Sequence, residues 1–394
     1  MVFVSVFVKT YQQSVISNQS SNMKIGILTL PLHTNYGGIL QAYALQTVLE
    51  RMGHEVEIIT FPRVQARLNT SNKLKVYINR FIKRFVLQKN IYVFQEKEIN
   101  RKFPIVSKNT QAFIDKYIKV RKYSRPSDIQ EKDFDSIVVG SDQIWRAIYL
   151  NKYAFGIRNA YLDFAKNWNI TRISYAASFG TSFWEYSKEE TEDCKRLIQK
   201  FDAVSVREED GVRLCKEHFG TEAKHVLDPT MLLEREDYER IVEQRKLKKS
   251  NGNFFVYVFD RTPNLDYTIN RLAEERSLTP FTITVSSLGP KTNPDDIVCK
   301  HIEAWLRAFM DSELIVTDSF HACVFSLIFN KPFIVFGNKG RGMSRFDSLL
   351  KLFDCEYRLV ESYNDISEKH FRSPDIDKSK AYQASVSFLK NAIN

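Results

Sequence analysis

The sequence predicts an α/β protein built from two mainly parallel sheets. Short apolar runs typical of strands alternate along the 394 residues with amphipathic runs typical of helices. The alternation starts near residue 24 and again near residue 254, on either side of the polar, basic segment EQRKLKKSNGN. Polar loops follow several strands, at the edge where open sheets bind ligands. We therefore expect two Rossmann-like domains facing each other across a cleft, the GT-B type of architecture.

Each domain follows from its own series of elements. In the first domain, residues 23–248, we expect strands at 24–30, 55–60, 136–139 and 203–206 and helices at 39–52 and 189–200. In the second, residues 249–370, we expect strands at 254–259, 281–285, 314–317 and 332–336 and helices at 267–276 and 301–311. A terminal helix at 378–392, within 371–394, should pack back on the first domain. Residues 1–22 match no secretory signal, and we expect a dispensable, disordered extension.

The composition argues against several kinds of protein and site. No run of about 18 apolar residues occurs, so we expect no transmembrane helix. The five cysteines are scattered without a CxxC pair, which argues against a zinc site and a disulfide framework and favours a reducing cytoplasm. We expect neither a metal nor a tightly bound cofactor.

The net charge of +10 is unevenly distributed. Residues 58–95 contain eight Lys and Arg residues and no Asp or Glu, and apolar residues recur there at helical spacing. A basic amphipathic helix can lie on an anionic membrane, here through residues 73–89, or can be an ordinary core helix with a solvated basic face. The cations do not alternate with aromatics in a groove-like pattern, so nucleic acid is a disfavoured partner.

Two loops of the first domain carry candidate acceptor-binding residues. Paired glycines at a helix start let a ligand approach the backbone, although a plain turn explains them equally well. A carboxylate and an aromatic ring just after a strand suit a sugar, although Ser or Asp there is also typical of a helix cap. The residues are Asn35, Tyr36, Gly37, Gly38 and Gln41 in the first loop, and Ser141, Asp142, Gln143 and Trp145 in the second.

Later loops add a hydroxyl, cations and a histidine. Ser178 follows the strand in RISYAASFG, and Arg207 ends the strand 203–206, where it can grip a carboxylate or phosphate or form a structural ion pair with Glu208. The glycine-rich segment GNKGRGMSR contains Lys339, Arg341 and Arg345, as in an anion cradle.

His321 stands where the strand 314–317 gives way to a helix. A core histidine bonded to a backbone carbonyl is the alternative to a functional one. The position at a strand exit beside Asp318 and Ser319 favours a site.

Seven segments together resemble the polysaccharide pyruvyl transferase family. In chain order, between about residues 23 and 360, they are MKIGILTLPLHTNYGGILQAYAL, VVGSDQIW, SYAASFG, VSVREEDG, VLDPTMLL, VTDSFHACVFSLIFNKPF and SRFDSLL. The resemblance implies a GT-B-like fold, phosphoenolpyruvate as donor, and a product in which a pyruvate ketal bridges two hydroxyls of a sugar. It further suggests bacterial capsule or exopolysaccharide assembly with a lipid-linked acceptor, in the cytoplasm or at the inner face of the membrane.

The resemblance also suggests roles for individual residues. Arg207 and His321 would serve the donor, His321 as general acid, general base or both. The need of this chemistry for a general acid and a base, and not the resemblance, makes Asp142 a candidate second base or a holder of sugar hydroxyls, and His33 a weaker candidate. Some members have Arg-Leu-His where this chain has Ser319-Phe320-His321, so one donor-binding cation is missing, for which Lys339, Arg341 or Arg345 is a conjectural replacement.

Two other functions remain open. A nucleotide-sugar glycosyltransferase could share this architecture, and would release a nucleoside diphosphate instead of phosphate. A non-catalytic protein that binds a membrane surface or nucleic acid could use the basic segment 58–95, with salt-dependent binding and no turnover.

Overall fold

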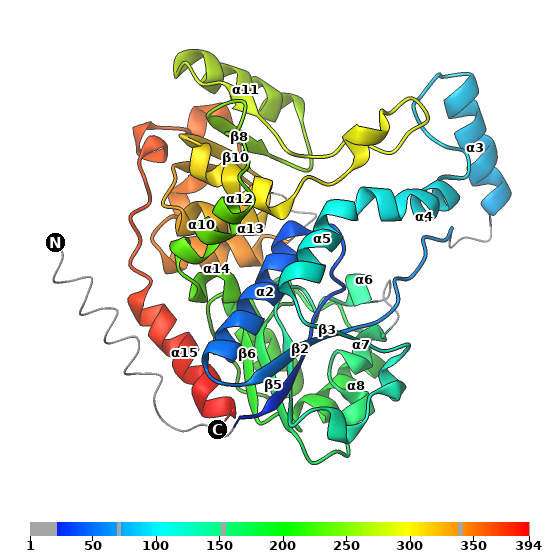
Figure 1. The fold of residues 1–394 in the computed structure, drawn as a ribbon, viewed down its shortest axis with the longest axis vertical. Coiled ribbons are helices and arrows are strands. Elements are labelled where there is room, and N and C mark those ends of the chain that lie inside the picture. Colours follow the sequence, from blue (N-terminus) through cyan, green and yellow to red (C-terminus); the bar gives the residue numbers. More distant parts are fainter. Residues whose placement is uncertain (1–21, 69–71, 151–154, 338–341, 394) are drawn as a thin grey trace.

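The computed structural model describes residues 22–68, 72–150, 155–337 and 342–393. The expectation for residues 1–22 therefore lies almost wholly outside the described residues. Two parallel sheets form two halves of the molecule, one above the other in Figure 1. This confirms the α/β class and the GT-B-like pair of Rossmann-like domains.

The first sheet has seven parallel strands in the order β3-β2-β1-β4-β5-β6-β7. Ligands bind in such sheets beyond the strand ends, at the point where the order reverses, which here lies between β1 and β4. The strands are β1 (Lys24–Leu28), β2 (Glu55–Thr60), β3 (Val120–Lys122), β4 (Ser136–Gly140), β5 (Thr171–Ala177), β6 (Ala203–Val206) and β7 (Lys224–His225).

The second sheet has five parallel strands in the order β12-β11-β10-β8-β9, which reverses between β8 and β10. Asp318, just after β10, accepts hydrogen bonds from the amides of Phe259 and Asp260, just after β8, at 2.9 and 3.0 Å. The carboxylate thus joins the two strand ends at the reversal. The strands are β8 (Phe254–Tyr257), β9 (Pro280–Phe281), β10 (Leu314–Thr317), β11 (Phe333–Phe336) and β12 (Leu359–Val360).

Helices cover both sheets, and the central strands are buried apolar runs, as expected of parallel sheets covered on both faces. The helices are α2 (Tyr36–Arg51), α3 (Lys73–Phe85), α4 (Gln95–Val106), α5 (Lys108–Tyr117), α6 (Ala147–Leu150), α7 (Gly156–Asn159), α8 (Lys188–Ile198), α9 (Glu209–Leu214), α10 (Arg235–Gln244), α11 (Pro263–Glu275), α12 (Ile302–Asp311), α13 (Phe320–Ile328), α14 (Ser344–Leu352) and α15 (Ser379–Ile393). No helix within the described ranges is long and apolar enough to cross a membrane.

The strand expected at 281–285 is wrong beyond its first residue. β9 consists of Pro280 and Phe281 only, at the edge of the second sheet. Val285 is 40% exposed, whereas Ile283 still packs against the core, so the apolar residues here are only partly covered and form no further strand.

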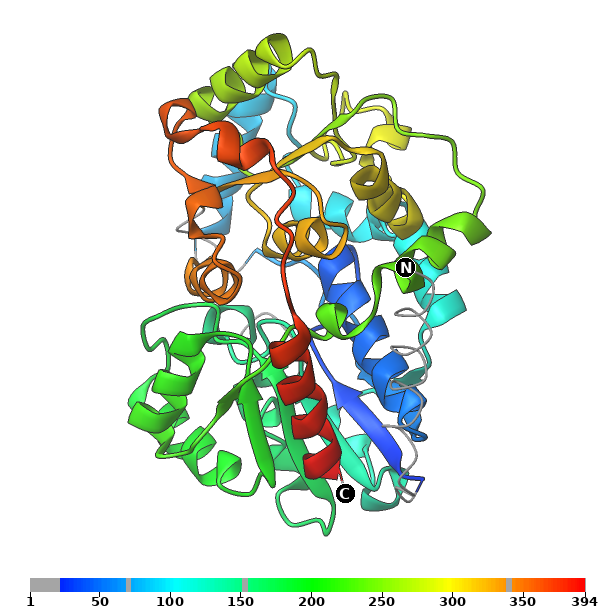
Figure 2. The ribbon, with the colours of Figure 1, turned by 90° about the vertical axis from the view of Figure 1, so that its left-hand side faces the viewer.

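The chain crosses between the two halves twice. It first crosses between Pro229–Leu232, which contacts α2, and α10, which packs against α12 of the second half. After the second sheet it returns, and α15 packs against the first sheet (Figure 2). The Leu227 amide donates to the Ser385 hydroxyl at 2.9 Å, and the Tyr175 and Phe388 rings lie 6.3 Å apart.

Candidate functional site

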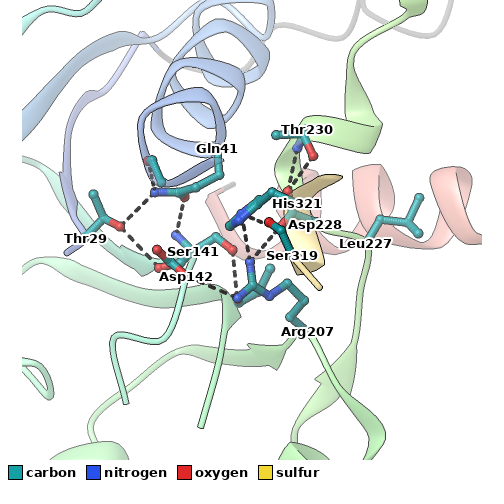
Figure 3. A network of polar contacts seen from close by, with 12 residues as sticks. Thr29, Gln41, Ser141, Asp142, Arg207, Leu227, Asp228, Thr230, Ser319 and His321 are labelled. Atoms are coloured by element: carbon teal, nitrogen blue, oxygen red, sulfur yellow. Dashed lines mark hydrogen bonds and ion pairs between the residues drawn. The ribbon is translucent and has the colours of Figure 1, made fainter. Parts of the chain in front are cut away.

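The ends of the two sheets bring Arg207 and His321 together. Arg207 is the first residue after β6, and His321 is the second residue of α13, which follows β10. The α13 helix starts at Ser319, whose hydroxyl accepts a hydrogen bond from the Ala322 amide at 3.4 Å. The Nη1 atom of Arg207 lies 3.5 Å from Nε2 of His321 (Figure 3). A guanidinium from one domain thus contacts an imidazole from the other.

Two carboxylates hold this guanidinium. Arg207 donates from Nη1 to Oδ2 of Asp228 at 2.6 Å and from Nη2 to Oδ1 of Asp142 at 3.3 Å. His321 Nε2 lies 3.8 Å from the same Asp228 oxygen. The other Asp228 oxygen accepts hydrogen bonds from the Thr230 amide and hydroxyl, at 3.0 and 2.6 Å. We call Asp142, Arg207, Asp228 and His321 the interdomain centre.

Burial determines the protonation of the histidine. His321 is 5% exposed, and this burial, with the nearby cations Arg207 and Arg345, lowers its pKa from 6.5 to about 4. Asp228 and Asp142 oppose the shift without reversing it. The imidazole is therefore neutral at pH 7 in this state.

The carboxylates of the interdomain centre stay ionised although they are buried. Burial alone raises the pKa of a carboxyl, but the charge on Arg207 offsets that effect and holds the pKa values of Asp142 and Asp228 below their usual range. The same two carboxylates raise the pKa of Arg207 against its own burial. The centre thus holds one cation, two anions and a neutral imidazole.

A second buried arginine adjoins the centre. Arg345 is 6% exposed, and its guanidinium carbon lies 5.2 Å from the centroid of the Phe320 ring. The guanidinium carbon of Arg207 lies 4.6 Å from that centroid. Burial and the charge on Arg207 lower the pKa of Arg345 to about 10, so both arginines are charged at pH 7.

The close approach of the His321 ring to Gly37 explains why the first loop carries glycines. A Cβ atom at residue 37 would lie 2.1 Å from Cγ of His321, so only a glycine lets the start of α2 pass the imidazole. A Cβ at Gly38 would lie 2.9 Å from Nδ2 of Asn35 and 3.3 Å from Oδ2 of Asp142. The paired glycines therefore bring the backbone of α2 against the interdomain centre, which a plain turn does not require.

The other candidates of that loop have structural partners. Gln41 donates to Thr29 Oγ1 at 3.0 Å and to the Gly38 carbonyl at 2.9 Å, and accepts from the Ser141 amide at 3.0 Å. It ties the ends of β1 and β4 together. Tyr36 donates its hydroxyl to the Lys300 carbonyl at 3.0 Å and so joins the two domains.

Trp145 does not fit the expected role in sugar stacking. Its ring is fully buried, stacked on Tyr161 with centroids 4.9 Å apart, and its indole N–H donates to the Ala160 carbonyl at 3.1 Å. The ring therefore belongs to the core below the first sheet and presents no face to a sugar. The helix-cap reading of this loop is also wrong, since Asp142 adopts a φ of 63° and the next helix, α6, begins only at Ala147.

Several buried polar atoms around the centre lack a hydrogen-bond partner among the described residues. They are Nε2 of Gln143, Oγ of Ser178, Nε of Arg207 and Oε2 of Glu208. Buried polar atoms are normally bonded, so such a cluster suggests room for a ligand or water. Ser141 is not among them, because its hydroxyl donates to the Ala176 carbonyl at 2.9 Å.

The ion pair considered between Arg207 and Glu208 does not form. Glu208 instead accepts hydrogen bonds from the amides of Phe179 and Gly180, at 2.7 and 3.0 Å, because the two side chains leave the end of β6 in different directions. Asp228, the partner that Arg207 does have, was missed by sequence reasoning. The sequence signal for Asp228 is a carboxylate immediately before Pro229, three residues after the end of β7.

The remaining candidates lie around or outside the centre. Ser319 is half-buried and caps α13. His33 packs edge-on against Phe103 of α4, with centroids 5.4 Å apart, and burial lowers its pKa to about 4. Lys339 and Arg341 fall outside the described residues. Within the described ranges, no three His, Cys, Asp or Glu side chains are grouped to hold a metal ion.

Comparison with known proteins adds a family to this geometry. The model of a family described as "Polysaccharide pyruvyl transferase" matches residues 35–340. No curated protein matches the chain.

Solved structures with distant overall similarity include a UDP-GlcNAc 2-epimerase from Neisseria meningitidis bound to UDP-GlcNAc, at 11% identity and a TM-score of 0.43, covering 94% of this chain and 100% of that one. Another is UGT89C1 from Arabidopsis thaliana complexed with UDP-L-rhamnose, at 9% identity and a TM-score of 0.47, covering 95% and 94%. Similarity this distant says nothing about the substrate of the present chain.

Proposed function

The chain belongs to the polysaccharide pyruvyl transferase family, and from that premise we propose that it transfers pyruvate from phosphoenolpyruvate to two hydroxyls of a sugar. The observation that carries the proposal is the 3.5 Å approach of Arg207 to His321 between the ends of the two sheets. An anion-binding cation and a proton-transferring group thus meet at one point, as this chemistry requires.

The charges of the site set a condition on donor binding. Arg207 and Arg345 are balanced by Asp142 and Asp228, so the described side chains offer a donor trianion no net positive charge. Protonation of His321 adds one charge, and a bound trianion favours that protonation by raising the pKa from about 4. Lys339 and Arg341 are proposed to add the rest.

The histidine can then serve both proton transfers. Protonated His321 donates to the methylene carbon, which becomes the methyl group and leaves a cationic carbon beside it. A sugar hydroxyl adds to this carbon and returns its proton to the neutral imidazole. The bond to the phosphate oxygen breaks, and the second hydroxyl closes the ketal. Of the two hydroxyl protons, one replaces the proton given to the methyl group and the other leaves with hydrogen phosphate.

Asp142 is proposed to hold the sugar hydroxyls. It lies beside Asn35 at the start of α2, and Asn35 is exposed.

The centre itself is almost covered, with Arg207 3% and His321 5% exposed. We propose that substrate entry requires the two domains to part. A lipid-linked sugar of capsule or exopolysaccharide assembly, at the cytoplasmic face of the membrane, is the proposed acceptor.

Mass spectrometry of lipid-linked sugars exposed to the protein and phosphoenolpyruvate tests the reaction. The expected product is heavier than the acceptor by pyruvate minus water, and phosphate is released in equal amount. A parallel incubation with a nucleotide sugar should release no nucleoside diphosphate. The reverse result would reject the proposal in favour of a glycosyltransferase.

A further inference from the structure

The helix α3 turns its apolar face to solvent, whereas an ordinary surface helix turns that face to the core. None of its residues is buried. Five apolar side chains share one face, and all are exposed: Leu74 (73%), Ile78 (52%), Phe81 (53%), Ile82 (44%) and Phe85 (56%). The side turned to the protein carries the half-buried Val76 and Tyr77. It also carries Arg80, which forms two hydrogen bonds to the carboxylate of Glu96 in α4, at 2.8 and 2.9 Å. The core-helix reading of this segment is therefore wrong.

The helix is nevertheless fixed in place. Besides the Arg80–Glu96 pair, the Tyr77 and Phe94 rings pack with centroids 5.0 Å apart. The segment after α3 reaches the second domain, where Asn90 donates to Thr292 at 3.0 Å and accepts from the Lys291 amide at 2.8 Å. Figure 1 shows α3 at the far end of α4, away from both sheets. The apolar face thus points outward on an anchored support.

Charge identifies the surface that this face fits. Residues 58–95 contain eight cations and no carboxylate. At 100° per residue, the exposed Lys75 and the half-buried Arg84 lie on the two sides of the apolar face, and Lys83 lies opposite it. An apolar face bordered by cations fits the interface of an anionic bilayer, where each nearby cation strengthens binding roughly fivefold. A second copy of the chain fits less well, because its own cationic segment, also without carboxylates, would repel the first. A nucleic acid fits less well because it would leave the apolar face in water.

We propose that α3 docks the protein on an anionic membrane surface, with Leu74, Ile78, Phe81, Ile82 and Phe85 entering the interface and the surrounding cations contacting lipid phosphates. The helix lies in the plane of the interface and does not cross the bilayer. The proposal concerns where the protein is held and does not depend on the reaction it catalyses.

Flotation of the full chain with vesicles tests the proposal. Vesicles of phosphatidylcholine with phosphatidylglycerol should bind the protein at least about tenfold more strongly than phosphatidylcholine alone, and raising the salt concentration should weaken binding. Lys75→Glu with Arg84→Glu, the two cations beside the apolar face, should lower binding by at least about tenfold. Phe81→Ser with Phe85→Ser should lower it about tenfold by removing apolar area.

The matched control is Phe183→Ser, since Phe183 is 64% exposed but lies outside α3. This variant should bind vesicles as the unchanged protein does. Equal binding by all variants, or no binding to anionic vesicles, would overturn the proposal. So would a concentration-dependent dimer that the double serine variant abolishes, since the face would then join two copies.

Discussion

The interdomain centre and α3 depart from ordinary packing in opposite ways. The centre buries four ionisable side chains between two domains, whereas α3 exposes five large apolar side chains to solvent. Buried charge is tolerated because Arg207 is paired with two carboxylates. Exposed apolar area has no such compensation within the chain. The contrast teaches that the fold offsets buried charge with paired charge from residues that follow other strands, whereas it leaves the apolar face of α3 without a partner among the described residues.

The largest expected effect is at the histidine of the centre. His321→Gln should lower pyruvyl transfer by roughly 100- to 10,000-fold, because a positioned proton transfer is lost, while the protein still folds. The rate of phosphate release from phosphoenolpyruvate, in the presence of the acceptor, measures the rate of transfer. The control is His218→Gln, which removes an imidazole stacked on Trp184, 4.1 Å between centroids, and should leave the rate unchanged. Full activity of the His321 variant would refute its assignment.

Arg207→Met should destabilise the fold as well as abolish transfer. It leaves Asp142 and Asp228 buried without their cation, a change that costs about 3–5 kcal/mol in free energy of unfolding. Urea denaturation measures this, and Arg207→Lys should recover part of the loss. If the methionine variant unfolds at the same urea concentration as the parent, the centre is not the buried ionic unit described here.

Gly37→Ala should cost about 1–3 kcal/mol, because its Cβ meets the His321 ring. The diagnostic measurement is a double-mutant cycle with His321→Gly, which removes both the ring and the His321 Cβ atom, 2.5 Å from the position of the added Cβ. In that background the Gly37 substitution should be nearly neutral. Additive effects of the two changes would mean that Gly37 serves some other contact.

The buried histidine also predicts a dependence of stability on pH. Because the pKa of His321 is lowered from 6.5 to about 4, the folded state binds fewer protons than the unfolded state between these values, so stability falls as pH falls through that window. At about pH 4.5 the loss should be on the order of 2 kcal/mol relative to pH 7. Asp142 and Asp228, whose pKa values are lowered from 3.8, lose their contribution only below that pH.

Comparing His321→Gln with the parent by urea denaturation at both pH values isolates this contribution. The subtraction matters because His33 has a similarly lowered pKa and acts in the same direction. The variant should lose less stability on acidification than the parent does. Equal losses would place the pKa of His321 near its ordinary value.

The smallest expected effect is at α3. Phe81→Ser with Phe85→Ser should change the free energy of unfolding by less than about 0.5 kcal/mol, because the rings are already exposed. Phe325→Ala, in the core of the second domain, should cost about 3–5 kcal/mol by contrast. A large loss of stability from the α3 changes would show that the face is covered in solution.

Local pattern was enough to predict most of the elements. The strands β2, β6 and β10 have the expected bounds, because a buried parallel strand is a short apolar run with turn residues at both ends. The expected strand at 281–285 failed because an edge strand depends on its single neighbour and not on its own pattern. The sequence pattern showed that the α3 segment is amphipathic, but it did not show whether the apolar face of the helix points toward the core or toward solvent.

By itself, the sequence determined the two-sheet fold, the loops that carry polar groups, and the prominence of Arg207 and His321, since all three follow from local periodicity and residue type. Only the tertiary structure decided that Asp228 holds Arg207, that Glu208 does not, that Trp145 is core, and that the apolar face of α3 points outward. Each of these depends on which side chain meets which across a distance in sequence. A local pattern does not encode these contacts, because they are set by how distant elements of the chain pack together.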